Sequence, residues 1–175
     1  MKVLDLGCGI GLTPQKLDLP SAWQITGLDV SYSLVAKAHV DFPDRSFVCA
    51  AAEYLPFPDG CFDRVVSNVA LPYTDIPKTV AEAYRILIPD GIFLASLHHA
   101  GFTLGELRKA LPNPKASLYR VWVLVNGIIF HIFGRALGES FQTERGIRIA
   151  LRHANFVNVV FRHDSKRWFV EARKR

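Results

Sequence analysis

The first residues able to do chemistry form a glycine-rich turn directly after a short apolar segment. Val3 to Leu6 are followed by Gly7-Cys8-Gly9-Ile10-Gly11. Because glycine lacks a side chain, a ligand can lie directly against the backbone of such a turn. The spacing is GxGxG rather than the dinucleotide fingerprint GxGxxG, since Leu12 stands at the third glycine position, and a phosphate-binding GK[ST] loop is absent. A tight strand-to-helix connection without a ligand is the alternative interpretation.

Two carboxylates flank this turn in the sequence. Asp5 stands two residues before Gly7, and Asp29 follows the glycines by about twenty residues, at the end of a second apolar segment. A carboxylate beside the turn repels a pyrophosphate but accepts hydrogen bonds from an ammonium group. Asp29 is placed to accept both hydrogens of a ribose diol, or else to stabilise the start of the next helix beside Ser31. Together they favour a cationic adenosyl ligand without phosphates.

The elements that must position these residues alternate between strands and helices. Proline or a capping residue opens each of the first three helices, at Thr13-Pro14, at Ser31 and at Asp75 with Pro77. Pro89-Asp90-Gly91 predicts a tight turn before the fifth strand. This alternation predicts parallel strands with helices on both faces of the sheet. The five strands are expected at Val3 to Leu6, Gln24 to Asp29, Ser46 to Cys49, Phe62 to Ser67 and Ile92 to Leu97.

The pattern changes after His99. Residues 100–142 contain no clear strand, and we expect an inserted helical cover there, whose aromatic side chains Trp122, Phe130 and Phe133 either roof a ligand pocket or belong to the core. A helix over Thr143 to Ala154 and an antiparallel hairpin complete the chain, which we expect to form one domain over residues 1–175. The hairpin strands are expected at Val157 to Arg162 and Arg167 to Glu171.

Four segments, in this order, carry a resemblance to a known family: VLDLGCGIG, GLDVS, AAEYLPFPDGCFDRVVSNVALPY and EAYRILIPDGIFLAS. They cover residues 3–96 and resemble the class I S-adenosylmethionine-dependent methyltransferases, most of all the small-molecule group. The resemblance implies a doubly wound, Rossmann-like α/β sheet of seven mostly parallel strands, with the terminal hairpin supplying the single antiparallel strand. It also implies S-adenosyl-L-methionine as cofactor. The family normally has helices before its first strand, whereas this sequence starts almost on that strand, so either the site is unusually open or the natural beginning of the chain is not part of this sequence.

The resemblance also assigns ten positions to the cofactor. The loop Gly7-Cys8-Gly9 would hold the sulfonium compound. The other assignments are Asp5 for the methionine part, Asp29 for the ribose, Val30 beside the adenine, Ala52 and Glu53 at the adenine edge, and Asn68 with Val69 on the methionine side.

No catalytic residue can be assigned from the sequence, but three candidates follow predicted strands. His98 and His99 end the fifth strand, where a histidine near neutral pKa can remove a proton from a hydroxyl, although two surface histidines are an equal alternative. Tyr73 is the third. It ends Asn68-Val69-Ala70-Leu71-Pro72-Tyr73, which replaces the NPPY of nucleobase amino-methyltransferases. We assemble no metal-ligand cluster from the sequence.

Composition restricts the class of protein and its partners. The 175 residues carry a net charge of +5, of which +4 lies in residues 162–175. Three cysteines without CxxC spacing and no export signal predict a cytoplasmic protein. Residues 118–137 contain Arg120, His131 and Arg135, so we expect no transmembrane segment, but contact with a membrane surface is a minority alternative.

The leading hypothesis is therefore an enzyme that methylates oxygen, or else carbon, of a small and partly apolar acceptor. Because methyl transfer needs chiefly alignment and exclusion of water, the absence of an assigned base does not argue against it. Three alternatives stay open. They are a module that binds S-adenosylmethionine without catalysis, a nucleic-acid methyltransferase that uses the basic tail, and, less favoured, a nicotinamide dehydrogenase.

Overall fold

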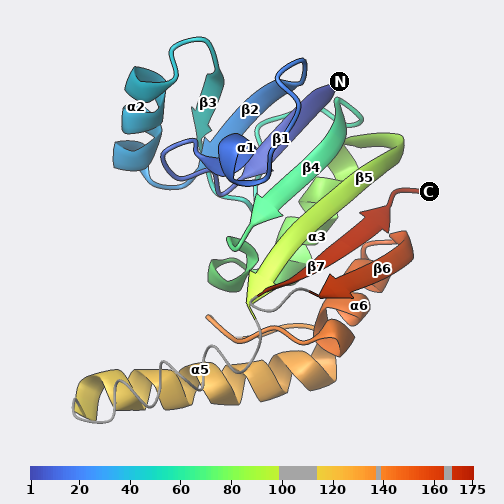
Figure 1. The fold of residues 1–175 in the computed structure, drawn as a ribbon. Helices are drawn as coiled ribbons and strands as arrows, with labels where there is room; N and C mark the ends of the chain where they lie inside the picture. The colour runs from blue at the N-terminus through green and yellow to red at the C-terminus, as the bar shows by residue number, and fades with distance from the viewer. Residues whose placement is uncertain (99–113, 137–138, 164–166) are drawn as a thin grey trace.

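The computed structural model describes residues 1–98, 114–136, 139–163 and 167–175 (Figure 1). Their strands form one seven-stranded sheet in the order β3-β2-β1-β4-β5-β7-β6. β1 to β5 are parallel to one another. β7 pairs antiparallel with both β5 and β6, so β7 is the one reversed strand. The strands are β1 Lys2–Leu6, β2 Gln24–Asp29, β3 Ser46–Cys49, β4 Phe62–Asn68, β5 Leu87–His98, β6 Val157–His163 and β7 Arg167–Arg173.

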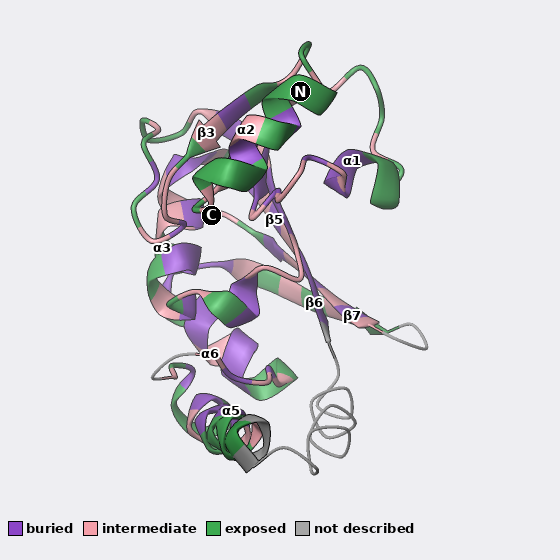
Figure 2. Ribbon diagram, turned by 90° about the vertical axis from the view of Figure 1, so that its left-hand side faces the viewer, coloured by how far each residue is buried: buried purple, intermediate pink, exposed green. Residues whose placement is uncertain are grey.

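Helices cover both faces of this sheet, as Figures 1 and 2 show. α1 and α2 lie on one side, and α3 and α6 lie on the other, whereas α5 lies beyond the carboxyl ends of β4 and β5. This is the doubly wound arrangement that the alternating sequence predicts. The helices are α1 Thr13–Lys16, α2 Tyr32–Asp41, α3 Ile76–Ile86, α5 Pro114–Phe133 and α6 Glu144–His153, and a short 3-10 helix, η1, spans Leu71–Tyr73.

The main hydrophobic core fills the space between the sheet and helices α3 and α6. Leu4 and Leu6 of β1, Phe93 of β5 and Leu151 of α6 are fully buried in it. A smaller cluster on the opposite face joins Cys8 to Val35, Ala38 and Phe47 under α2. Apolar side chains therefore pack on both faces of the sheet, and β1 and β4 lie in the middle of its strand order.

One predicted boundary is wrong. Pro89-Asp90-Gly91 does not separate α3 from the fifth strand, because β5 already begins at Leu87, opposite Phe62 of β4. The next regular pair joins Arg64 to Ile92, so the extra residues form a bulge, and Asp90 adopts a left-handed φ of 63° within it. The turn-forming tripeptide bends the strand instead of ending it.

The start of α1 also differs from the expectation. Leu12, and not Thr13, is the N-cap residue, and no side chain caps the helix. The Thr13 side chain instead lies near the Asp5 carboxyl, where it lowers the pKa of Asp5. Ser31 is the N-cap residue of α2 as predicted, but its side chain makes no capping hydrogen bond, whereas the Asp75 side chain accepts from the Lys78 backbone N–H at the start of α3.

α5 is the longest helix that the structure describes, and it packs against α6 on one side only. Val123 and Phe130 are buried on that side, and a Cβ added to Gly146 of α6 would lie 2.5 Å from the Phe130 ring. Gly146 therefore allows the two helices to approach closely. Among the described residues, no helix combines the length and the apolar character that crossing a membrane requires.

Replacing Phe130 by alanine is expected to lower the free energy of unfolding by about 3 to 5 kcal/mol, because it leaves a cavity between α5 and α6. Phe133, three residues further along and exposed, is the matched control, and its alanine variant is expected to stay within about 0.5 kcal/mol of the wild type. Urea unfolding of both variants measures the difference. Equal effects of the two substitutions would contradict this packing of α5.

Candidate functional site

A cavity of about 550 Å³ opens at the carboxyl ends of the parallel strands. Open α/β sheets bind ligands at this edge, and the volume suits a small organic ligand. Seven of the ten positions assigned to the cofactor line it: Gly7, Asp29, Val30, Ala52, Glu53, Asn68 and Val69. The remaining described lining residues are Leu6, Leu28, Ala50, Ala70, Tyr73 and Thr74.

The glycines of the turn after β1 serve different purposes. A Cβ on Gly7 would lie 2.2 Å from the Ala70 Cβ, so Gly7 lets the loop after β4 approach the turn. A Cβ on Gly9 would meet nothing within 4 Å, and its φ is 54°. Packing therefore requires glycine at position 7, whereas the space beside Gly9 remains open to a ligand.

Four of the five backbone N–H groups of this turn are already used within the protein. Gly7 and Cys8 both donate to the Leu28 carbonyl, at 2.7 and 3.0 Å, and Gly11 donates to the Cys8 carbonyl at 2.9 Å. Gly9 donates to the Asp29 carboxylate at 2.9 Å. Phosphate-binding loops instead point such groups at the ligand. The geometry of this turn therefore does not fit a pyrophosphate.

The charge of the cavity wall also does not fit a pyrophosphate. Asp29 and Glu53 contribute carboxylates, and no lysine or arginine stands among the lining residues that the structure describes. Asp29 also accepts from the Ser31 backbone N–H, at 2.9 Å, and Glu53 accepts from the Asp75 backbone N–H, at 2.7 Å. These bonds orient both carboxylates, which leaves them able to accept further hydrogen bonds from a ligand. A cationic ligand with hydroxyl or amino groups fits this wall.

Asp5 is a buried acid next to the turn, although it does not line the cavity. Its side chain is 1% exposed, and one carboxyl oxygen, Oδ1, has no hydrogen-bond partner. The pKa of Asp5 is raised to about 7, chiefly because the carboxyl is buried; the nearby Asp29 also raises it, whereas Thr13 lowers it. An unpartnered buried carboxyl oxygen is costly, so it marks a place where a ligand cation would be favourable.

The loop after β4 forms the opposite wall. Val69, a β-branched residue, has a left-handed φ of 61°, and its N–H donates to the Ser96 carbonyl. The Asn68 side-chain oxygen accepts from the Ser96 hydroxyl at 2.7 Å. Backbone strain of this kind persists where surrounding bonds hold it, and it is commonest at ligand sites.

Tyr73 is the catalytic candidate that lines the cavity. Partial burial raises the pKa of Tyr73, and the Glu139 carboxylate raises it further. Glu139 accepts a hydrogen bond from the Tyr119 hydroxyl, and its other oxygen lies 3.9 Å from a guanidinium nitrogen of Arg120. A phenol with a raised pKa stays protonated near neutral pH, so Tyr73 is suited to donate a hydrogen bond and not to act as a base.

Glu139, Tyr119 and Arg120 were not identified from the sequence. They form a cluster near Tyr73 because α5 brings Tyr119 and Arg120 next to the segment after the helix. No local signal marks this contact, since the pairs are about twenty residues apart and depend on how α5 packs.

Several other candidates are not among the described residues that line the cavity. Cys8 has its side chain in the small core cluster, so only its backbone shapes the turn. The backbone of His98 ends β5, and His99 lies outside the described residues. Of the expected roof residues, Phe130 belongs to the core, whereas Trp122 and Phe133 are exposed on α5. None of these three is among the described residues that line the cavity.

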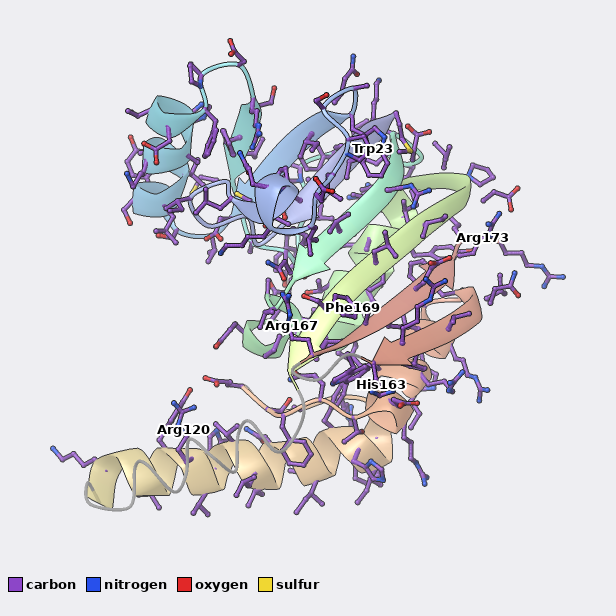
Figure 3. The ribbon with its side chains drawn as sticks, in the orientation of Figure 1. Trp23, Arg120, His163, Arg167, Phe169 and Arg173 are labelled. Carbon is purple, nitrogen blue, oxygen red and sulfur yellow. The ribbon has the colours of Figure 1, made fainter. Side chains whose placement is uncertain are left out.

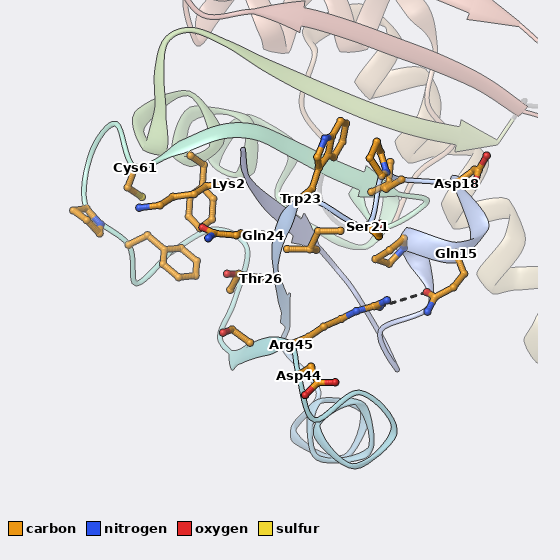
Figure 4. Close-up of a pocket in the computed structure, with 18 residues that line it drawn as sticks. Lys2, Gln15, Asp18, Ser21, Trp23, Gln24, Thr26, Asp44, Arg45 and Cys61 are labelled. Carbon is orange, nitrogen blue, oxygen red and sulfur yellow. Dashed lines mark hydrogen bonds between the residues drawn. The ribbon is translucent and has the colours of Figure 1, made fainter.

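A larger hollow of about 900 Å³ lies at the opposite edge of the sheet (Figure 4). It is lined by Lys2, Gln24 and Ser46, which begin three of the strands, and Arg45 crosses it to reach Gln15 at 3.4 Å. This is the amino edge, where parallel strands do not present ligand sites. We therefore take the smaller cavity as the site. Among the described residues, no group of three or more His, Cys, Asp or Glu side chains is placed to hold a metal ion.

Comparisons with known proteins bear on this site. The family model described as "Methyltransferase domain" matches residues 4–95. A malonyl-[acyl-carrier protein] O-methyltransferase of Geobacter sulfurreducens is 34% identical over 93% of this chain and 58% of its own length. The mitochondrial arginine hydroxylase NDUFAF5 of Rattus norvegicus is 36% identical over 62% of this chain. That match spans about a third of the hydroxylase, 32% of its length.

Solved structures share the fold. A structure described as a SAM-dependent methyltransferase from Methanosarcina mazei has a TM-score of 0.69 at 20% identity, covering 99% of this chain and 92% of its own. The phosphoethanolamine N-methyltransferase 2 of Haemonchus contortus, solved in complex with S-adenosyl-L-methionine, has a TM-score of 0.68 at 16% identity. That match covers 99% of this chain and 48% of the other.

The buried Asp5 predicts an unusual dependence of stability on pH. The pKa of Asp5 is about 7 in the folded protein, against an ordinary value of 3.8 for an aspartate, so the folded state binds more protons between these limits. The contribution of Asp5 to stability is therefore fully present below about pH 4 and is lost as the pH rises to about 7. The loss is on the order of 4 kcal/mol.

Asp5→Asn is expected to remove this dependence, so the variant gains stability relative to the wild type as the pH rises from 4 to 8. Urea unfolding at several pH values measures it, because titrations of the other carboxyl groups are common to both proteins. Asp44→Asn, at an exposed carboxylate, is the control. Parallel stability curves for wild type and Asp5→Asn would rule out a buried, protonated Asp5.

Proposed function

Because this chain belongs to the class I S-adenosylmethionine-dependent methyltransferases, we propose that it transfers the methyl group of S-adenosylmethionine to an oxygen atom of a small, partly apolar acceptor. The family match spans residues 4–95, which is more than half of the chain. The curated relatives are longer than this chain, so the acceptor and the activity of a whole protein are part of the proposal.

The observation that carries the proposal is the character of the cavity wall. It presents carboxylates and no described cation, and the neighbouring turn keeps its N–H groups for the protein. S-adenosylmethionine carries a sulfonium, an ammonium and a ribose diol but no phosphate, so each feature of the wall matches it. The pyrophosphate of a dinucleotide would find no cation among the described lining residues, and most N–H groups of the turn already donate within the protein.

Each residue has a defined part in this proposal. Asp29 accepts hydrogen bonds from the ribose hydroxyls, Glu53 lies at the adenine edge, and Asp5 attracts the positively charged methionine end. Val30, Ala52 and Val69 contribute apolar surface, and Gly9 leaves room for the ligand. When bound, S-adenosylmethionine supplies an electrophilic methyl group. The protein then has to align the acceptor and exclude water.

Tyr73 is the residue that we expect to face the acceptor. It stands at the exposed margin of the cavity, and its hydroxyl remains a hydrogen-bond donor near neutral pH. Such a donor can orient an acceptor oxygen without removing its proton. Oxygen is favoured because, of the two curated relatives given above, the one that covers 93% of this chain is named an O-methyltransferase.

The relatives named arginine hydroxylases make hydroxylation a second candidate. A nucleic-acid acceptor receives less support, because the fold uses part of the basic tail. The Lys174 ammonium donates to the Leu87 carbonyl at 2.7 Å, and Arg173 pairs with Asp90 at 3.6 Å. These cations are therefore not wholly available to phosphates.

Turnover distinguishes these functions. The protein is incubated with methyl-labelled S-adenosylmethionine and the small-molecule fraction of a cell extract, and products are identified by mass spectrometry. We expect one or more small molecules to carry the labelled methyl group, with S-adenosylhomocysteine formed in equal amount. A product that gains oxygen but no label would indicate hydroxylation, and tight cofactor binding without any product would indicate a non-catalytic module.

Asp29→Ala is expected to weaken S-adenosylmethionine binding by about 1 to 3 kcal/mol, because the ribose hydroxyls lose a charged acceptor. Isothermal titration calorimetry measures the change, and circular dichroism checks that the variant is folded, since Asp29 also accepts from Gly9 and Ser31. Asp44→Ala serves as the control at an exposed acid. Unchanged affinity in a folded Asp29→Ala protein would contradict the ribose assignment.

A further inference from the structure

α5 has two apolar faces, and only one of them packs against the protein. Phe130 is buried against α6, and Val123 and Asn126 are buried on the same side of the helix, where the Asn126 amide donates to the Glu139 carbonyl. Figure 2 views the helix nearly end-on, with its buried side turned toward α6 and its exposed side turned away from the rest of the molecule. A helix that is apolar all round is normally covered all round.

The exposed face is a continuous apolar stripe. Its members recur at spacings of three and four residues along the helix, which places them on one side over about four turns. Trp122 is 45% exposed, Ile128 56% and Phe133 58%. The stripe consists of Leu118, Val121, Trp122, Val125, Ile128, Ile132 and Phe133. Seven large exposed apolar side chains on one helix exceed what scattered surface residues explain.

No charged residue interrupts the stripe between Leu118 and Phe133, and Lys115 lies one turn before Leu118 on the same side of the helix. Arg120 projects on the side of the sheet, as Figure 3 shows, and lies 3.9 Å from Glu139. α5 contains no aspartate or glutamate. Just past its end, an apolar cavity of about 450 Å³ is lined by Ile129, Phe133, Arg135 and Ala136. An apolar slot with an arginine at its rim suits a hydrocarbon chain that ends in an anionic group.

We propose that the stripe on α5 docks onto the surface of an anionic lipid bilayer, with α5 lying parallel to the surface. The apolar side chains enter the boundary between headgroups and acyl chains, Trp122 sits at that boundary, and Arg135 meets lipid phosphates. The rest of the molecule remains on the water side, since the stripe points away from it. This inference does not depend on the proposed methyl transfer.

A second copy of the chain is the other occupant of comparable shape, and charge disfavours it. Arg120 already lies 3.9 Å from Glu139, so the cation that the structure describes at the apolar cavity is Arg135. Because α5 contains no aspartate or glutamate, a second α5 packed along the stripe would offer Arg135 no acid of its own. A surface of anionic phosphates offers the complementary charge.

The test compares binding to vesicles of phosphatidylserine mixed with phosphatidylcholine and to vesicles of phosphatidylcholine alone. Co-sedimentation of the wild type with the anionic vesicles is expected, weakening as salt rises. Val125→Asp places a charge at the centre of the stripe and is expected to reduce vesicle binding about tenfold or more. Val40→Asp, at an exposed valine on α2, is the matched control and should bind as the wild type does.

Arg135→Glu tests the attraction between Arg135 and lipid phosphates, and it should lower binding to anionic vesicles without altering the unfolding midpoint.

Several outcomes would overturn the proposal. These are absence of wild-type binding, equal binding of Val125→Asp and wild type, and equal binding to both vesicle types. A dimer in light scattering that Val125→Asp dissociates, without vesicle binding, would assign the stripe to a second copy. Cofactor affinity of all these variants, measured by calorimetry, should stay unchanged, so failure here is separable from failure of the proposed function.

Discussion

The site depends on one carbonyl group. Leu28 accepts hydrogen bonds from both Gly7 and Cys8, so the turn after β1 is tied to the end of β2. This contact places the Gly9 backbone nitrogen 2.9 Å from the Asp29 carboxylate. Because Gly7 has no Cβ, Ala70 can also approach the turn, and the loop after β4 packs against it. Three chain segments far apart in the sequence thereby meet at one edge of the sheet.

Electrostatics then decide what this edge can bind. A turn with free N–H groups would attract phosphate, but here the same groups donate to Leu28, Cys8 and Asp29. What remains for a ligand is carboxylate oxygen, at Asp29 and Glu53 in the wall and at the buried Asp5 behind it. Since Asp5 is protonated in a large fraction of molecules near pH 7, an incoming cation would also lower its pKa and recover some of the cost of burying it.

The fold was predictable from local patterns to the extent that local interactions determine it. β2 and β3 have the predicted limits, and the reversed position of β7 follows the resemblance. The prediction failed at Leu87, because pairing with Phe62 extends β5 through residues whose own preference is a turn. It also failed at Thr13, which is buried beside Asp5 while Leu12 takes the N-cap position of α1. Both errors arise from tertiary partners that a single sequence does not reveal.

In the candidate site, too, local sequence patterns predicted some features, whereas others depend on tertiary packing. The spacing of Gly7, Asp29 and Asn68 along the chain indicated one edge of a sheet, and all three line the cavity. The side-chain direction of Cys8 and the cluster around Glu139 depend on packing, so no motif marked them. α5 is the clearest case, because apolar residues occur around the whole helix and periodicity cannot separate a buried face from an exposed one. Only contact with α6 shows that Phe130 belongs to the core and Phe133 does not. Of the two alternatives for the aromatic side chains of α5, the core holds for Phe130, whereas Trp122 and Phe133 lie exposed and are not among the described residues that line the cavity.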